Sequence, residues 1–268
     1  MAVLSAFLCS CSKDDNGGDE VTSKKNKVVT VTEYEWKYGE KSTYGELYEK
    51  FTYNEANLLT QKETHYYNAV VGRIPDYYTY TYDDNKHLIE STRKGLSSYK
   101  YKYTTNSIDS IATMDAYNDK GKLTESWAYT YDSNRRLLQA KQTYDYAICY
   151  VDDYTYEGNN VVVTRHRVDN GELFGTTYYE YDSHKNLLKK TWKNGETGRE
   201  DLQVYNEYTY NANGSILKKT VHEYNYGDTS RIRYEDYTYN SDGTLKTIHK
   251  SYSYKTDESD LDYTYSYE

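Results

Sequence analysis

The sequence is short of the residues that usually build and interrupt a globular core. It has one proline, three cysteines, two methionines, three phenylalanines and three tryptophans in 268 residues. Its mean hydropathy is −1.05, and so low a value is typical of disorder. Disordered chains are also poor in aromatic residues, whereas this chain has 38 tyrosines. Tyrosine and threonine favour the pleated surface of a sheet, so the composition predicts an all-β protein without a large aliphatic core.

Signals for nucleic-acid binding and for catalysis are also missing. The net charge is −9, and basic residues are mixed with acidic ones along the chain. Phosphate backbones are bound by clustered lysine and arginine. There is no glycine-rich phosphate loop and no nucleophile-elbow motif. We therefore expect a non-enzymatic protein that uses no cofactor and does not bind nucleic acid.

Metal binding is not indicated either. No two histidines have the HxH or HxxxH spacing of metal ligands, and there is no CxxC motif. The six histidines are His65, His87, His166, His184, His222 and His249. His87 and His184 stand where other copies of the repeat described below have Arg136 or Asn213. This interchange indicates the surface of a turn, and we expect no metal site.

The first ten residues form a short apolar segment, MAVLSAFLCS, which is followed directly by Cys11. Such a segment before a cysteine is similar to the end of a lipoprotein signal, in which the cysteine after the cleavage point is acylated. The resemblance implies that residues 1–10 are a signal remnant and that Cys11 is lipidated. Two or more acyl chains suffice for stable anchoring, so the membrane is an expected partner through Cys11.

The residues after Cys11 are polar and acidic. The run CSKDD, from Cys11 to Asp15, resembles the export signal of surface lipoproteins in Bacteroidota. The resemblance implies an outer-membrane lipoprotein that is exposed at the cell surface. Residues 11–26 are polar and contain glycine, which is typical of a flexible tether. We place the boundary of the folded domain at residue 27, so that the domain covers residues 27–268.

The rest of the chain repeats one short unit. Six copies align without gaps, starting at Phe51, Tyr80, Tyr129, Tyr179, Tyr208 and Tyr237; they read FTYNEANLL, YTYDDNKHL, YTYDSNRRL, YEYDSHKNL, YTYNANGSI and YTYNSDGTL. Weaker copies lie between them. The clear starts are mostly about 25 to 29 residues apart, or a near multiple of that, which is in the range of repeat architectures.

Each part of the unit has a structural role. Tyr-x-Tyr alternates with period two, so both rings lie on one face of a strand and the residue between them on the other. The following Asp or Asn begins a turn, in which its side chain can accept from a backbone N–H two residues on. Gly214 or Gly243 then supplies the positive φ that lets the return strand begin. Each unit is therefore predicted to be a β-hairpin.

Repeated hairpins joined by short connections predict one long antiparallel meander. We expect about 16 to 18 strands, coiled by strand twist into a ribbon or an open shell. Tyrosine ladders would replace the aliphatic core. The aliphatic residue that begins each return strand is expected to share the tyrosine-covered interior; these residues are Leu59, Leu88, Leu137, Leu187, Ile216 and Leu245.

The unit Y-x-Y-[DN]-x-x-G-x-L resembles the YD repeat of the bacterial RHS/YD-repeat family, over essentially residues 27–268. In that family the repeats form sheet ribbons that, in large toxins, spiral into a hollow shell around a toxic cargo. This chain is far shorter than such shells. The resemblance therefore implies the repeat architecture rather than the enclosure of a cargo.

Three tryptophans, Trp36, Trp127 and Trp192, are the candidate binding aromatics, because exposed aromatic platforms stack on sugar rings. The alternative is that they are members of the tyrosine ladders. The leading hypothesis is a surface lipoprotein whose repeat scaffold contacts a glycan, a host surface or a protein outside the cell. Two other hypotheses stay open: an accessory or shell protein of an RHS-like secretion system, and a carbohydrate-active hydrolase.

Overall fold

Nineteen strands follow one another along the residues that the computed structural model describes, which are 27–37, 40–68, 72–144, 149–225, 228–253 and 260–268. The first ten are β1 (Lys27–Lys37), β2 (Glu40–Lys41), β3 (Glu46–Tyr53), β4 (Leu59–Asn68), β5 (Gly72–Tyr82), β6 (Leu88–Lys94), β7 (Tyr99–Thr105), β8 (Ile111–Asn118), β9 (Leu123–Tyr131) and β10 (Leu137–Tyr144). The others are β11 (Tyr150–Glu157), β12 (Asn160–Arg167), β13 (Leu173–Tyr181), β14 (Leu187–Asn194), β15 (Glu200–Tyr210), β16 (Ile216–Asn225), β17 (Asp228–Tyr239), β18 (Leu245–Tyr252) and β19 (Leu261–Tyr267). Over these described residues, no helix could cross a membrane.

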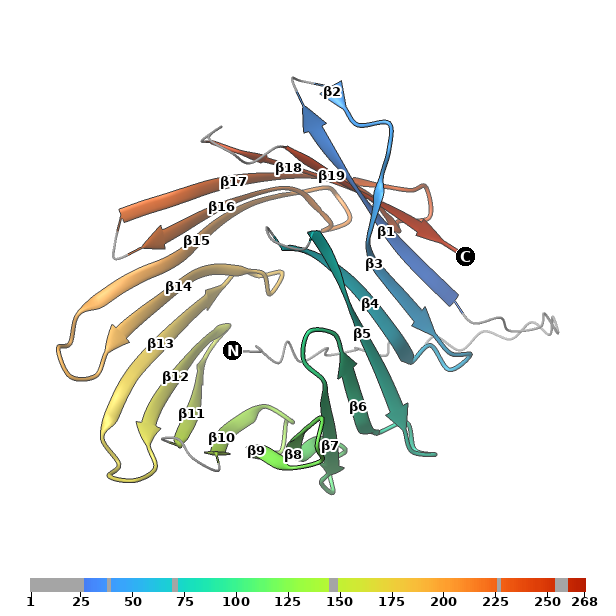
Figure 1. Cartoon of the computed structure of the whole chain (residues 1–268). Coiled ribbons are helices and arrows are strands. Elements are labelled where there is room, and N and C mark those ends of the chain that lie inside the picture. Colours follow the sequence, from blue (N-terminus) through green and yellow to red (C-terminus); the bar gives the residue numbers. More distant parts are fainter. Residues whose placement is uncertain (1–26, 38–39, 69–71, 145–148, 226–227, 254–259) are drawn as a thin grey trace.

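The sheet closes on itself. From β3 to β19 each strand pairs antiparallel with the next, and β1 pairs with β3 on one side and with β19 on the other. Val29 stands opposite Tyr267 on β19 and opposite Phe51 on β3. Figure 1 shows β1, in blue, lying beside β19, in red. Among the described strands, the two-residue strand β2 pairs with β1 alone, so the ring is an 18-strand barrel.

The all-β antiparallel meander is confirmed, but the open ribbon or shell is wrong. The open form would leave backbone donors and acceptors unpaired along its first and last strands, and such edges are a liability in sheet proteins. Strand twist instead brings β1 and β19 together. Backbone hydrogen bonds continue to the end of this seam, where Val28 N donates to Glu268 O and Glu268 N donates to Val28 O. We call the β1–β19 pairing the seam.

Most of the turns that end a Tyr-x-Tyr strand have the predicted chemistry, although in the 240–244 turn the Asn240 side chain donates to Thr244 Oγ1 instead. In the 83–87 turn, Asp83 Oδ1 accepts from the backbone N–H groups of Asn85, two residues on, and of His87. The same pair of bonds recurs in six other turns, at Asn54, Asn106, Asn118, Asp132, Asp182 and Asn211. The side chain thus satisfies backbone donors that the tight turn leaves unpaired.

The fourth residue of these turns has a positive φ. Gly214 and Gly243 have φ of 80° and 85°, as their place in the repeat predicts. Lys86, Arg135 and Lys185 stand at the same place and have φ of 69°, 63° and 64°, although side chains other than glycine are strained there. A register shift follows in the hairpin, as between Thr81 and Tyr82, which is typical of a three-residue hairpin loop with a bulge.

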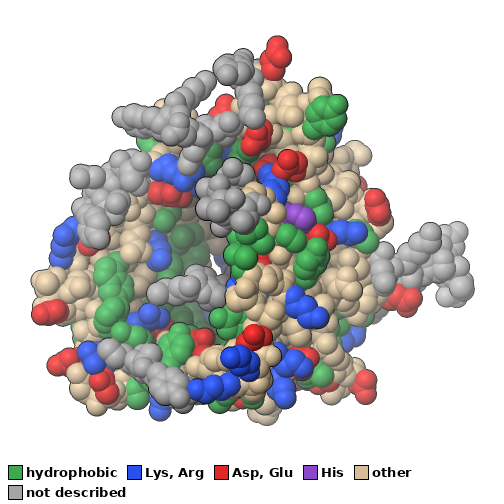
Figure 2. All heavy atoms as spheres, in the orientation of Figure 1, with side chains coloured by type: hydrophobic (Ala, Val, Ile, Leu, Met, Phe, Trp, Pro, Cys, Tyr) green, Lys and Arg blue, Asp and Glu red, His purple; other side chains and the backbone are tan. Residues whose placement is uncertain are grey.

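Cross-strand register places the tyrosines of successive units on one continuous face. Tyr80 is opposite Ser91, Ser91 opposite Tyr101, and Tyr101 opposite Ala116. Within the described residues, every buried side chain except that of Thr176 lies on this face. The concave face of a barrel crowds its side chains, and Figure 2 shows apolar side chains on the wall of a central hollow. We call this face the inner wall.

The aliphatic residues that begin the return strands reach the inner wall as expected. Each stands opposite the second tyrosine of its own unit, as Leu88 does opposite Tyr82 and Leu245 opposite Tyr239. None of the six is fully buried. They cover the end of the tyrosine ladder rather than form a separate core.

The opposite face of the wall is polar. Threonines from between the tyrosines meet across strands, and their Oγ1 atoms are 2.6 Å apart for Thr79 and Thr92 and 2.7 Å apart for Thr104 and Thr113. Charged pairs lie on the same outer face, for example Lys218 with Asp236 at 3.1 Å. Tyrosine inside and threonine outside is the alternation that the repeat predicts.

Candidate binding surface on the inner wall

The inner wall is lined by half-buried tyrosine rings whose hydroxyls are partly withdrawn from water. Burial raises the pKa of Tyr80, Tyr208 and Tyr265 to about 12. Successive rings on one strand lie side by side, as Tyr208 and Tyr210 do with centroids 6.0 Å apart and planes at 20°. Such a wall offers flat apolar surface together with hydroxyl donors, which suits contact with a sugar or another amphipathic ligand.

The return strands divide the inner wall into two unlike sectors. On β6, β8 and β10 the inner-wall residues include Ser91, Met114, Ala116 and Ala140, together with Arg93. On β14, β16, β17 and β18 they include the long cationic residues Lys190, Lys219, Arg233 and Lys250, together with the apolar Val221 and Ile248. The repeats therefore share their tyrosines but differ in the inner-wall residues of their return strands.

Most inner-wall cations are paired with a carboxylate. Arg93 contacts Asp76 at 2.6 Å, and Arg165 contacts Asp152 at 2.6 Å. Asp76 and Asp152 are almost fully buried. A buried carboxylate without such a partner would be strongly unfavourable. These two pairs therefore hold their strands in register and leave little charge for a ligand.

Glu235 is the centre of a denser cluster on β16 to β18. Its Oε1 accepts from Arg233 Nε at 2.8 Å, and its Oε2 accepts from the Tyr237 hydroxyl at 2.5 Å. Burial alone would raise the pKa of Glu235, but the hydrogen bond from Tyr237 and the charges of Lys219 and Arg233 lower it. Glu235 is therefore an ionised carboxylate with both oxygens engaged.

Lys190, Lys219 and Lys250 differ from the paired cations. Among the described residues, no carboxylate lies within salt-bridge distance of any of the three. Each ammonium instead lies near a tyrosine ring, 5.8 Å from the centroid of Tyr179 or Tyr208, or 4.2 Å from that of Tyr263. Burial lowers the pKa of each lysine.

These lysines were not predicted from the sequence, although a signal was present. In LLKK and ILKK, which begin at Leu187 and Ile216, only one of the two lysines can share a face with the tyrosines. The bulge after each turn decides which one, and that is Lys190 and Lys219.

The three predicted binding aromatics are not brought together. Trp127 and Trp192 lie on the inner wall, opposite Met114 and Thr177 respectively. Trp127 is parallel to Tyr129, with planes at 4° and centroids 6.1 Å apart. Trp192 packs near Phe174, with centroids 5.7 Å apart. Both are half-buried members of the aromatic lining.

Trp36 lies outside the barrel, beside the seam. Its ring is 5.5 Å from that of His249, and His249 Nδ1 is 2.6 Å from Asp262 Oδ1. Lys41 Nζ is 2.8 Å from the other oxygen of Asp262. Burial would raise the pKa of Asp262, but its bonds to Lys41 and His249 lower it. The cluster ties β1, β2, β18 and β19 together on the outer face.

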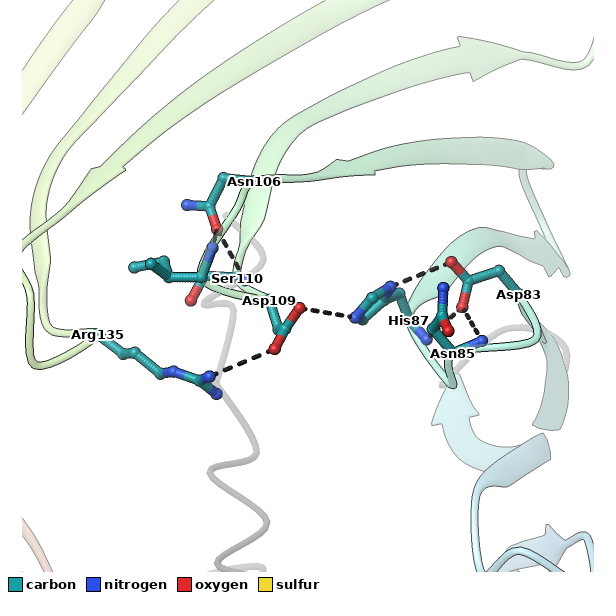
Figure 3. A network of polar contacts seen from close by, with 8 residues as sticks. Asp83, Asn85, His87, Asn106, Asp109, Ser110 and Arg135 are labelled. Atoms are coloured by element: carbon teal, nitrogen blue, oxygen red, sulfur yellow. Dashed lines mark hydrogen bonds and ion pairs between the residues drawn. The ribbon is translucent and has the colours of Figure 1, made fainter.

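The tight turns form one end of the barrel, and a polar network joins three of them (Figure 3). His87 Nδ1 is 3.1 Å from Asp83 and its Nε2 is 3.3 Å from Asp109, which also contacts Arg135 at 3.3 Å. Within the part of the chain that is described, no group of three or more His, Cys, Asp or Glu residues could hold a metal. The predicted lipidation residue Cys11 lies outside the described residues, as do the signal remnant and the tether.

Comparisons with known proteins show only distant likenesses. No family model and no curated protein matches the chain. A porin-like protein from Bacteroides uniformis is 12% identical with a TM-score of 0.46, over 90% of this chain and 96% of that one. A porin-like protein from Bacteroides vulgatus is 13% identical with a TM-score of 0.33, over 70% and 93%.

A further likeness is to the Photorhabdus luminescens Tc holotoxin pore, which is 12% identical with a TM-score of 0.32. It covers 82% of this chain but only 16% of that one. At these identities and scores, no function passes from any of these proteins to this chain.

Proposed function

We propose that this protein is a non-enzymatic lipoprotein of the outer-membrane surface whose barrel binds a saccharide on its inner wall. The observation that carries the proposal is the continuous lining of half-buried tyrosines, which faces a hollow rather than a packed core (Figure 2). Aromatic faces with hydroxyl donors at their edges are suited to the apolar faces and hydroxyls of sugars.

The polar side chains of the outer face support the proposal that the barrel is surrounded by water and is attached to the membrane by a lipid anchor. It carries threonine pairs such as Thr79 with Thr92, and ion pairs such as Lys189 with Glu180 at 3.2 Å. A wall in lipid presents an outward apolar band with aromatic girdles instead. Acylation of Cys11 would supply the attachment to the membrane.

Three inner-wall carboxylates, Glu235, Asp76 and Asp152, support binding rather than hydrolysis. Glycosidases need one carboxyl group that is protonated near neutral pH to act as the acid. The pKa of Glu235 is lowered, and both of its oxygens are engaged. Asp76 and Asp152 are each paired with an arginine. These groups hold the wall together and are poorly suited to donate a proton.

The anchor is tested by replacing Cys11 with Ala, with Cys9→Ala as the matched control. We expect wild type and C9A to remain with the outer membrane and to be removed from intact cells by added protease. C11A should be released from the membrane fraction. Unchanged membrane association of C11A would contradict the lipoprotein assignment.

Saccharide binding is tested with the full chain carrying Cys11→Ala, labelled and applied to a glycan array. We expect binding that is lost when the inner-wall Trp127 is replaced by Ala and kept when the outer-face Trp36 is replaced by Ala. An array without any bound glycan would overturn the saccharide proposal.

A further inference from the structure

The cationic sector of the inner wall contains a row of alternating charges. Lys219, Glu235 and Lys250 stand in one cross-strand row, because Lys219 is opposite Glu235 and Glu235 is opposite Lys250. Side chains in such positions are direct neighbours. Two ammonium groups therefore flank one carboxylate whose oxygens are already bonded to Arg233 and Tyr237.

The carboxylate of this row is already engaged by another cation. Arg233 Nε lies 2.8 Å from Glu235, and Arg233 Nη1 lies 3.3 Å from Glu223. Among the described residues, no carboxylate lies within salt-bridge distance of Lys219 or Lys250. These two ammonium groups stand on the wall of a chain whose net charge is −9.

A third lysine extends this sector. Lys190 on β14 stands opposite Tyr179 and Val204 and, among the described residues, has no carboxylate partner. Lys190, Lys219 and Lys250 come from β14, β16 and β18, so one strand separates each from the next. Burying an ammonium without a counter-ion is unfavourable, and a ligand with several negative groups would supply those counter-ions.

We propose that the inner wall over β14 to β18 is a binding site for an acidic saccharide, whose carboxylate or sulfate groups contact Lys190, Lys219 and Lys250. The half-buried tyrosines beside two of these lysines, Tyr179 and Tyr208, are the platforms on which its rings lie. This inference rests on the proposed function and narrows its ligand from saccharides in general to those that carry negative charge.

The chain offers a matched control for each lysine. Lys189 and Lys218 precede Lys190 and Lys219 on the same strands, face outward, and pair with Glu180 and Asp236. Lys246 is exposed on the same strand as Lys250. The triple variants K190Q/K219Q/K250Q and K189Q/K218Q/K246Q lose the same three charges, so a difference between them reports position and not net charge.

Binding is measured by affinity electrophoresis of the full-length chain with Cys11→Ala in polygalacturonate, dextran sulfate or neutral dextran. We expect retention by one or both acidic polymers, weakened by added salt. The inner triple variant should lose about tenfold or more of its affinity, as expected when charge-assisted contacts are removed. The outer triple variant should stay within about threefold of wild type.

A second measurement needs no substitution. Amine acetylation of the same chain, followed by peptide mass analysis, should show Lys190, Lys219 and Lys250 protected by the acidic polymer that binds. Lys189 and Lys218 should react equally with and without it. This result stands even if the inner triple variant does not fold.

The outcomes separate the two proposals. Equal affinity for neutral and acidic polymers, with no protection of the three lysines, would overturn the acidic ligand and leave saccharide binding in place. Equal losses in the two triple variants would also overturn it. Failure of every polymer here and of every glycan on the array would overturn both.

Discussion

The hydroxyl of Tyr82 donates a hydrogen bond to the carbonyl oxygen of Leu59 at 2.8 Å, and so joins one hairpin to the hairpin before it. The second tyrosine of the unit makes the same bond in four further places, from Tyr131, Tyr156, Tyr239 and Tyr267 to Ile111, Leu137, Ile216 and Leu245. The acceptor is the aliphatic residue that begins a return strand. The two best-marked positions of the repeat are thus bonded to each other across units.

Removing one of these hydroxyls should lower stability. Tyr82→Phe and Tyr239→Phe keep the ring but leave a partly buried carbonyl without its donor, and each should cost about 1 kcal/mol of unfolding free energy. Urea unfolding measures the change. Tyr77→Phe is the control, because Tyr77 is 47% exposed on the outer face. A similar loss in the control would mean that the cross-unit bond is not the cause.

Glycine should stabilise the protein when it replaces a lysine whose backbone is in the left-handed region. Lys185→Gly relieves the strain of φ 64° and should raise the unfolding free energy by about 0.5–1 kcal/mol, after the added entropy of the unfolded chain is subtracted. Ser183→Gly in the same turn relieves no such strain and should be destabilising. A destabilised K185G would show that the lysine side chain contributes a contact that outweighs the strain.

Gly175 is required for space and not for its backbone angle. A Cβ atom there would lie 2.1 Å from the Trp192 ring and 2.7 Å from the Lys193 carbonyl oxygen. Gly175→Ala should therefore cost about 1–3 kcal/mol, as overpacking does. In a Trp192→Ala background the same change should cost less, because only the backbone contact remains. Equal costs in the two backgrounds would exclude the ring as the cause.

Alkaline pH should unfold the barrel. The pKa of Tyr80, Tyr208 and Tyr265 is about 12 in the folded chain, against about 10 when unfolded. The folded state keeps protons that the unfolded state releases. The stabilisation is therefore complete below about pH 10 and is lost as pH rises towards 12. Tyrosinate absorbance should rise, and the urea midpoint should fall, only above about pH 10.

The inner-wall lysines should make the free energy of unfolding rise with pH, at pH values just below those at which the tyrosines ionise. Burial lowers the pKa of Lys190, Lys219 and Lys250 in the folded chain, so the unfolded chain binds more protons just below the ordinary lysine pKa. The penalty for burying them is relieved as pH approaches about 10. Wild type should gain stability over this range more steeply than K190Q/K219Q/K250Q. Identical slopes would contradict the burial of these ammonium groups.

The local rules of this fold could be read from the sequence, and the closure could not. Tyr-x-Tyr, the Asp or Asn turn and the aliphatic return residue each act within one hairpin, so their roles follow from spacing alone. Closure depends on how twist accumulates over 18 strands and on β1, whose sequence KVVTVTEYEWK lacks the repeat. Because β1 does not match the repeat unit, its sequence did not indicate that it completes the ring.

The binding surface was predicted only in part. The tyrosine face followed from period two, and Trp127 and Trp192 are in that lining. The outward position of Trp36 depends on the register of β1 against β19, which only the closed ring defines. The inner lysines depend on the bulge after each turn, because a one-residue slip moves a side chain to the other face.

The seam also sets the order in which the molecule can be made. Every other pairing of the ring joins strands that are neighbours or near neighbours in sequence, so hairpins can form as the chain emerges. The seam joins Val29 to Tyr267, and it can form only when the last repeat exists. Pairing so distant in sequence is slow. Until it forms, β1 and the newest strand are both open edges, and a chain cut short by one repeat keeps them as sites for pairing with another molecule.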